Sequence, residues 1–221
     1  KDVLTTFRNI PNYNVKYKLI YAKDYGVPQN RPRILIVGIH KDFSNNFLDD
    51  DALLAEYLPF PSSDYPDIEE IFSDIIDGDF VYGESTNLYK NDPLNKWQED
   101  IRYNPFTKQT LKKNDPLTDH QYSKHSSKVV EKFTYMIKNN GEIPEHLKTK
   151  KFSQRVLPKK WGNKGPTITA CSLPDDFVHY SQPRSLTVRE WARLQTFPDW
   201  YEFRGKRTTG GLRRAGNPRK T

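Results

Sequence analysis

The strongest hydrophobic periodicity in the 221-residue chain lies over residues 126–139. Apolar side chains recur there at the spacing of one helix face, and a glycine at position 141 follows as a stop signal. This pattern predicts an amphipathic helix whose apolar stripe packs into a core: Val129, Val130, Phe133, Met136 and Ile137. Residues 66–76 show a second stripe within an acidic stretch and residues 49–57 a weaker one, so both predict short acidic helices. Residues 83–116 are polar with little periodicity, which favours loops with short strands.

The first 41 residues have the pattern of a piece of an α/β unit. Residues 2–10 look like the end of a helix, and residues 15–21 alternate as in a strand. The continuous apolar run at 34–39 predicts a strand buried on both faces, as in a parallel or mixed sheet. The loop between the two strands carries Arg31 and Arg33, whose guanidinium groups match phosphate oxygens. An isolated Arg-x-Arg is more often a surface ion-pairing group, so these residues alone do not establish an anion site.

Residues 185–203 predict a short capped helix. Thr187 and Glu190 have the spacing of a capping box, in which each side chain satisfies a backbone N–H of the other residue. Arg189 and Arg193 are four apart and therefore share one helix face. Pro198 ends the helix, because proline cannot continue it. From the physics alone, an ordinary capped surface helix explains this stretch about as well as a functional one.

Composition adds charge to this picture. The formal net charge is +7, and most of the excess lies in the C-terminal half, which suits a polyanionic partner such as nucleic acid. A single cysteine excludes an internal disulfide framework and a multi-cysteine metal site. The sequence contains neither an apolar run as long as a membrane span nor a signal peptide pattern. We therefore expect no membrane partner and a reducing, cytoplasmic compartment.

The densest basic stretch is residues 148–164, where aromatic side chains stand among the lysines. Such interleaving suits contact with a nucleic-acid backbone, although a solvated loop explains it about equally well. A Gly-Pro turn and a β-rich passage at 165–170 follow, and these can project hydroxyl and backbone groups into a groove. Four histidines in the second half fit no common zinc spacing, so we expect no metal site.

Two motifs resemble those of the cytosine-C5 DNA methyltransferases. Residues 184–199 read R-x-L-T-x-R-E-x-A-R-L-Q-x-F-P-D, similar to the late motif of that family, and residues 25–39 read YGVPQNRPRILIVGI, similar to its Gln/Arg cluster and core strand. The motifs stand about 150 residues apart in the order of the family. The resemblance implies a bacterial restriction-modification enzyme, associated with the nucleoid, that transfers a methyl group from S-adenosyl-L-methionine to double-stranded DNA.

The resemblance also implies a domain plan and site residues. We expect an α/β fold: the C-terminal part of a Rossmann-like methyltransferase sheet plus a mixed α+β target-recognition domain. Residues 1–41 would end the catalytic domain, 42–183 would form the recognition domain, and 184–221 the late-motif helix and a basic tail. Gln29, Arg31 and Arg33 would lie beside the flipped cytosine and its flanking backbone. DNA contacts are expected from basic and hydroxyl side chains: Lys159, Lys160, Lys164, Thr167, Thr169, Arg184, Arg189 and Arg193. The acidic helices are expected on the face away from DNA.

Several family features are absent from this sequence. It has no glycine-rich loop for S-adenosyl-L-methionine and no Pro-Cys nucleophile, since Cys171 follows alanine. We therefore expect the C-terminal portion of an enzyme, inactive alone, whose nucleophile and cofactor loop lie on an N-terminal part or a separate catalytic subunit. A stand-alone, non-catalytic DNA-binding protein and an RNA-binding member of the same fold are alternatives.

Overall fold

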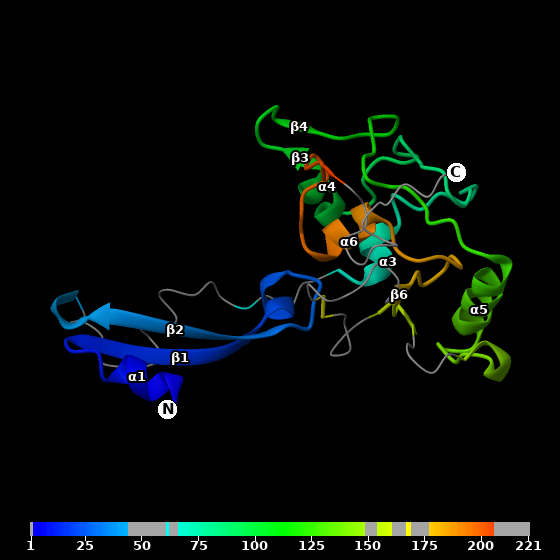
Figure 1. Ribbon diagram of the computed structural model, residues 1–221. Helices are drawn as coiled ribbons and strands as arrows, with labels where there is room; N and C mark the ends of the chain where they lie inside the picture. The colour runs from blue at the N-terminus through cyan, green and yellow to red at the C-terminus, as the bar shows by residue number, and fades with distance from the viewer. Residues whose placement is uncertain are drawn as a thin grey trace. The chain divides into compact units, whose positions relative to one another are not determined.

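The computed structural model describes residues 2–43, 61, 66–148, 154–160, 167–168 and 177–205. The chain divides into two compact units, residues 1–65 and 66–221, which we describe separately (Figure 1). The three-part domain plan drawn from the sequence stays a prediction. The expected helix at 49–57 lies outside the described residues, as does the tail beyond Gly205.

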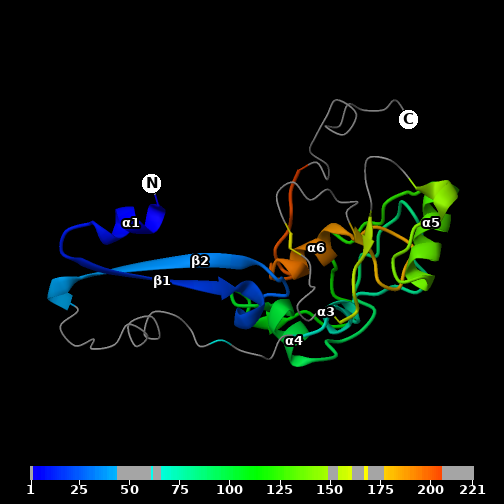
Figure 2. The same ribbon diagram turned by 90° about the horizontal axis from the view of Figure 1, so that it is seen from below.

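Unit 1 is a long antiparallel β-hairpin with a short helix beside it. Its elements are α1 (Val3–Arg8), β1 (Tyr13–Tyr21), η1 (Ala22–Tyr25), β2 (Pro32–His40) and η2 (Lys41–Phe43). The Asp2 carboxylate accepts from the Leu4 N–H and caps α1. The strands pair over their full length, from Tyr13 opposite His40 to Tyr21 opposite Pro32. Figure 2 shows α1 alongside this ribbon.

The predicted helix and strands of unit 1 are confirmed, but their burial is not. Among the described residues, β2 pairs only with β1, in antiparallel orientation rather than in a parallel or mixed sheet. Leu19 and Ile34 stand opposite each other and are 50% and 63% exposed. A continuous apolar run indicates a strand made for burial on both faces, but it does not reveal which segments cover those faces.

Unit 2 is built from short helices joined by long ordered loops. Its helical elements are α3 (Ile68–Phe72), α4 (Lys96–Arg102), α5 (Ser127–Lys138), η3 (Glu145–Leu147) and α6 (Val188–Leu194). Its strands are β3 (Tyr103–Asn104), β4 (Gln109–Thr110), β5 (Arg155–Val156) and β6 (Phe177–Val178). β3 and β4 pair antiparallel, whereas β5 and β6 pair parallel.

The apolar stripes found in the sequence form the core of unit 2. On α5, Phe133 and Met136 are buried with Val178 of β6, and Val129 and Ile137 pack around them. On the second predicted helix, the buried residues are Ile68, Ile71, Phe72 and Ile75. Helical periodicity thus identified the faces that pack, because an isolated helix of this length is stable only when its apolar face is covered.

Two features of unit 2 differ from the expectation. Residues 96–102 form α4, where only loops and short strands were predicted, and Asn95 caps it by accepting from the Gln98 N–H. The late helix α6 ends at Leu194, before Pro198, and Thr196 adopts a positive φ of 58°. Both differences arise from local backbone bonding, which hydrophobic periodicity does not report.

Candidate nucleic-acid interface

The centre of unit 2 is a cluster of buried ions. Asp74, just after α3, pairs with two guanidinium groups: Arg102 at the end of α4 and Arg193 on α6. Arg193 Nη2 lies 2.9 Å from Asp74 Oδ2, and its Nε donates to Asp199 at 3.1 Å. All four side chains are fully buried at these contacts. The cluster therefore ties together three segments that are distant in sequence.

A second buried network surrounds Glu190. Its carboxylate accepts two bonds from Arg184, at 2.8 and 2.6 Å, and one from the Thr187 N–H at 2.8 Å. The predicted capping box is confirmed, since the Thr187 hydroxyl also accepts from the Glu190 N–H. Glu190 is therefore an ion-pair partner as well as a helix cap.

Two buried histidines border this network in the neutral form. His120 Nε2 faces the Ile75 carbonyl at 3.0 Å, and a carbonyl can only accept, so the proton is on Nε2 and Nδ1 accepts from the Thr187 hydroxyl at 2.9 Å. His179 Nδ1 accepts from the backbone N–H groups of Ser181 and Gln182. Burial lowers the pKa of His120 to about 4 and that of His179 to about 3, against an opposing effect of Glu190.

The acids of the two networks are held ionised. Burial alone would raise the pKa of Glu190 and of Asp199, but Arg184 pairs with the first and Arg193 with the second. The net result is that each carboxyl has a pKa below its ordinary value. Ion pairing prevails because each carboxylate has a guanidinium group at hydrogen-bond distance.

The burial of the motif arginines corrects one prediction. Arg184, Arg189 and Arg193 were expected to contact DNA, yet all three are completely buried. The Arg189 guanidinium donates to Thr118 Oγ1 at 2.7 Å and to the Tyr201 carbonyl at 2.7 Å. A phosphate contact needs an exposed guanidinium, so we remove these three residues from the candidate interface. Sequence spacing placed Arg189 and Arg193 on one helix face but did not show that this face points inward.

The Gln/Arg loop of unit 1 is closed at the end of the hairpin. The Ala22 N–H donates to the Arg31 carbonyl at 3.0 Å, and Gly26 has a positive φ of 77° that ends η1. Arg33, in β2, is exposed, and its Nη1 donates to the Pro32 carbonyl at 2.7 Å. Gln29 is buried. Gln29 and Arg31 therefore lie in the loop before β2 and Arg33 lies at the start of that strand, while their role toward a base stays a prediction.

The basic segment of unit 2 is described only in part. Lys160 and Thr167 are exposed, whereas Lys164 and Thr169 lie outside the described residues, as does Cys171. Lys159 Nζ lies 3.1 Å from Glu69 of α3. This ion pair shows that α3 lies beside the basic segment and that its carboxylate neutralises one of the predicted lysines. The expectation that the acidic helices face away from DNA stays a prediction.

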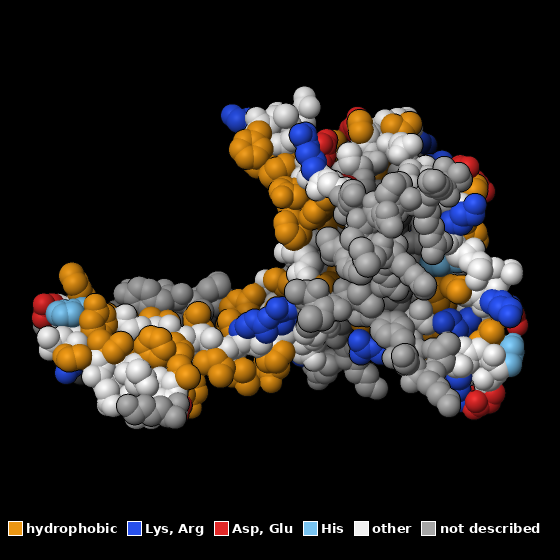
Figure 3. All heavy atoms as spheres, in the orientation of Figure 1, with side chains coloured by type: hydrophobic (Ala, Val, Ile, Leu, Met, Phe, Trp, Pro, Cys, Tyr) orange, Lys and Arg blue, Asp and Glu red, His pale blue; other side chains and the backbone are white. Residues whose placement is uncertain are grey.

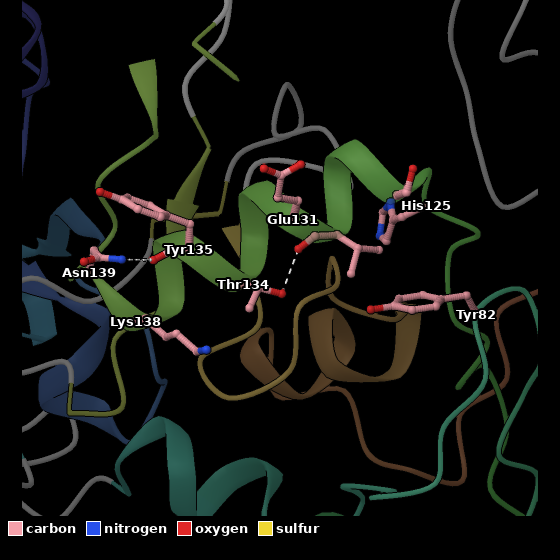
Figure 4. A pocket seen from close by; sticks show the side chains of 9 residues that line it. Tyr82, His125, Glu131, Thr134, Tyr135, Lys138 and Asn139 are labelled. Atoms are coloured by element: carbon pink, nitrogen blue, oxygen red, sulfur yellow. Dashed lines mark hydrogen bonds between the residues drawn. The ribbon is translucent and has the colours of Figure 1, made fainter. Parts of the chain in front are cut away.

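A cavity of about 690 Å³ in unit 2 runs along one face of α5 (Figure 4). Several of its polar side chains already have partners within the chain. The Tyr82 hydroxyl donates to the Pro183 carbonyl at 3.1 Å, Thr134 donates to the Val130 carbonyl, and Glu131 pairs with His146. A second cavity, about 260 Å³, is lined mainly by apolar side chains around Trp191, with Gln195 as its polar member.

No observation assigns S-adenosyl-L-methionine to either cavity. That cofactor carries a carboxylate, an ammonium group and a ribose, and each needs uncommitted polar groups aimed into the site. Within the described ranges, no group of three or more His, Cys, Asp or Glu side chains could hold a metal ion. Over the same ranges, no helix has the length and apolar character to cross a bilayer.

Two residues that the structure makes important were missed in the sequence. Asp74 stands inside the apolar run Ile71-Phe72-Ser73-Asp74-Ile75, and a lone acid at such a position was the available signal for a buried ion pair. Phe106 is exposed at the turn between β3 and β4. No sequence signal distinguishes it from a core phenylalanine.

Comparisons with known proteins agree with one another. The model of the family described as C-5 cytosine-specific DNA methylase matches residues 1–218. The Type II methyltransferase M.DdeI of Desulfomicrobium norvegicum is 31% identical over 225 residues, covering 95% of this chain and 50% of that protein. M.AquIB of Picosynechococcus is 37% identical over 95 residues, 43% of this chain and 66% of that protein. The chain thus spans about half the length of M.DdeI.

A solved structure supports the fold. It is described as a DNA modification methyltransferase encoded within an E. coli prophage. Its TM-score is 0.58 at 20% identity, and the match covers 87% of this chain and 52% of that chain. At this identity the likeness concerns the α/β methyltransferase fold alone.

The Asp74 cluster generates a stability prediction. Asp74→Ala should lower the free energy of unfolding by about 3–5 kcal/mol, because it leaves two guanidinium groups buried without their carboxylate. Asp79→Ala is the matched control, since Asp79 is exposed and should change stability by less than about 0.5 kcal/mol. Urea unfolding of both variants measures the difference. A loss below about 1 kcal/mol for Asp74→Ala would show that the cluster is not a main support of the fold.

The buried histidines generate a pH prediction. In the folded chain the pKa of His120 is about 4 and that of His179 about 3, both below the ordinary value of 6.5. Below pH 6.5 the two histidines are therefore protonated in the unfolded chain but still neutral in the folded one. Stability should therefore be complete above about pH 6.5 and fall as the pH drops toward about 4, by at most about 3 kcal/mol per pH unit for the two sites. Urea midpoints across this window test it. The exposed His146 is the control: His146→Gln should keep the slope, and a flat profile in the parent chain would contradict the assignment of neutral histidines.

Proposed function

Because this chain belongs to the C-5 cytosine-specific DNA methylase family, we propose that it is the DNA-recognition and pocket-framing portion of a DNA (cytosine-5-)-methyltransferase. In this proposal the chain binds a specific duplex sequence and frames the target cytosine. The nucleophile and the cofactor loop belong to a catalytic part outside these residues. The observation that carries the proposal is the family match over nearly the whole chain, combined with the absence of a Pro-Cys nucleophile from the sequence.

The exposed apolar surface of unit 1 supports the proposal that another part of the enzyme covers it. Val3, Phe7, Leu19 and Ile34 are exposed apolar side chains on one small hairpin unit. A two-stranded ribbon with so much exposed apolar surface is marginal by itself in water. In the proposed enzyme this surface packs against the remainder of the methyltransferase sheet, as the family fold implies.

The chemistry divides accordingly. Methyl transfer to C5 of cytosine requires a thiolate that adds at C6, which the proposal places on the catalytic part. It also requires the base to leave the stack. The role proposed for this chain is to receive that base: Gln29 offers an amide donor and acceptor, and Arg31 and Arg33 offer charge to the base and its flanking phosphates. S-adenosyl-L-methionine supplies the methyl group, and no residue described here is assigned to hold it.

Selection from a random duplex pool tests the proposal. The purified chain should enrich duplexes that share a short sequence containing cytosine, because a recognition portion that folds by itself reads base edges without the catalytic part. It should show no methyl transfer when S-adenosyl-L-methionine and the enriched duplex are added. Failure to bind duplex DNA at moderate salt, or preference for RNA over the same duplex, would refute the proposed function.

Lys160 generates a separate prediction within the basic segment. Lys160→Ala should weaken binding to all duplexes alike and reduce the slope of log affinity against log salt by about 1, as expected for one lost phosphate contact. Lys159→Ala should have the smaller effect, because Glu69 already neutralises Lys159. Lys96→Ala is the matched control, since Lys96 pairs with Asp100 at 2.7 Å. An effect of Lys160→Ala on one sequence only would exclude the phosphate role.

A further inference from the structure

A short hairpin in unit 2 presents an aromatic side chain to solvent. Phe106 lies in the turn between β3 and β4 and is 80% exposed, the most exposed of the large apolar side chains that the structure describes. Figure 1 shows β3 and β4 projecting from unit 2 beyond α4. In the same orientation, hydrophobic and cationic side chains stand together on this projection (Figure 3).

The turn that carries Phe106 has a fixed conformation. The Asn104 side-chain oxygen accepts from the N–H groups of Phe106, at 2.9 Å, and Thr107, at 3.4 Å. Lys108 takes a positive φ of 57°, and the strands close with Tyr103 opposite Thr110. The Phe106 ring meets the edge of Trp200, with centroids 5.3 Å apart and planes at 89°. These contacts hold the exposed phenyl ring of Phe106 in a defined position.

The buried ion cluster supports both rings. Arg102, which pairs with Asp74, precedes β3 directly, and its Nη1 donates to the Leu111 carbonyl at 3.3 Å, just after β4. Trp200 follows Asp199, whose N–H donates to the Ile101 carbonyl at 2.8 Å. The base of the hairpin and the segment that contacts its tip are therefore fixed to the same buried group.

The chemistry of the hairpin suits DNA better than a protein partner. Residues 103–113 contain Lys108, Lys112 and Lys113 and no aspartate or glutamate. The nearby acids of α4, Glu99 and Asp100, are both within ion-pair distance of Lys96. Around the turn, the exposed side chains are a phenyl ring, a hydroxyl, an ammonium group and an amide: Phe106, Thr107, Lys108 and Gln109. Apolar contact to a thymine methyl group and hydrogen bonds to base edges use these groups.

We propose that the β3–β4 hairpin enters the major groove of duplex DNA, where Phe106 makes an apolar contact with a base edge and Lys108 contacts a flanking phosphate. The major groove is wide enough for a two-stranded ribbon. The inference rests on the proposed function and deepens it by naming a specificity-determining residue. It places base reading on a segment whose sequence predicted only loops and short strands.

The test measures affinity of the full chain for two fluorescein-labelled duplexes: the sequence that the parent chain enriches from a random pool, and a shuffled version of it. Phe106→Ala should weaken binding to the enriched duplex about five- to 100-fold, change binding to the shuffled duplex less than about twofold, and leave the salt slope intact. Lys108→Ala should weaken both duplexes alike and reduce the slope by about 1. Leu94→Ala, which truncates another exposed apolar side chain, is the control and should bind as the parent chain does.

The outcomes separate the two proposals. Equal affinity of Phe106→Ala and the parent chain for the enriched duplex would overturn the hairpin inference while leaving DNA recognition in place. Binding of the parent chain without enrichment of any sequence would also overturn it, because a base-edge contact requires a sequence preference. Absence of duplex binding by the parent chain would refute the proposed function and the hairpin inference together. Loss of association with a catalytic part in Phe106→Ala, at unchanged DNA affinity, would assign the ring to a protein interface.

Discussion

Unit 2 depends on the carboxylate of Asp74, which pairs with Arg102 and Arg193 where no water reaches. Three segments meet at this one group: the end of α3, the end of α4 and the late-motif helix α6. Bringing ions out of water is costly, and their mutual attraction offsets that cost only when hydrogen bonding is complete. Here Asp199 and the Ile71 carbonyl accept the remaining Arg193 donors. The cluster therefore joins three segments that are distant in sequence and adds ionic contacts to their apolar packing.

Because Arg184, Arg189 and Arg193 are buried, a DNA interface would have to use other residues. The motif guanidinium groups look from their sequence like phosphate ligands, but Glu190, Asp74 and Asp199 hold them inside the protein. Exposed cations stand on other segments, among them Lys160 and Lys108 of the β3–β4 hairpin. Within the proposed function, the late motif acts indirectly: it builds the rigid body from which the contacting segments project. Its two ends reach the two networks, since Arg184 pairs with Glu190 and Asp199 pairs with Arg193.

The two units then have distinct parts in the proposed enzyme. Unit 1 has Gln29, Arg31 and Arg33 at one end of a two-stranded ribbon, in the loop before β2 and at the start of that strand, and several apolar side chains of the ribbon are exposed. Unit 2 has a buried centre of paired ions and an exposed hairpin between β3 and β4. In the proposed enzyme, unit 1 belongs to the larger methyltransferase sheet and unit 2 to the recognition portion. The chain spans about half the length of M.DdeI.

The sequence by itself determined several local features of this protein. Helical spacing identified the packed faces of α5 and the Ile68–Ile75 segment, the Thr187 and Glu190 capping box was recognisable from two residues, and alternation located β1. These features depend on near neighbours along the chain. The tertiary structure alone decided whether Arg184, Arg189 and Arg193 face water or acids, that Asp74 joins α4 to α6, and that Phe106 stays outside the core. The reason is that several partners of these side chains lie far away in the sequence, as Asp74 does from Arg193 and Thr118 from Arg189. Even for the nearby pair Arg184 and Glu190, the spacing does not show that both side chains are buried. The sequence shows which residues are charged, but only the tertiary structure determines which of these residues are paired inside the protein.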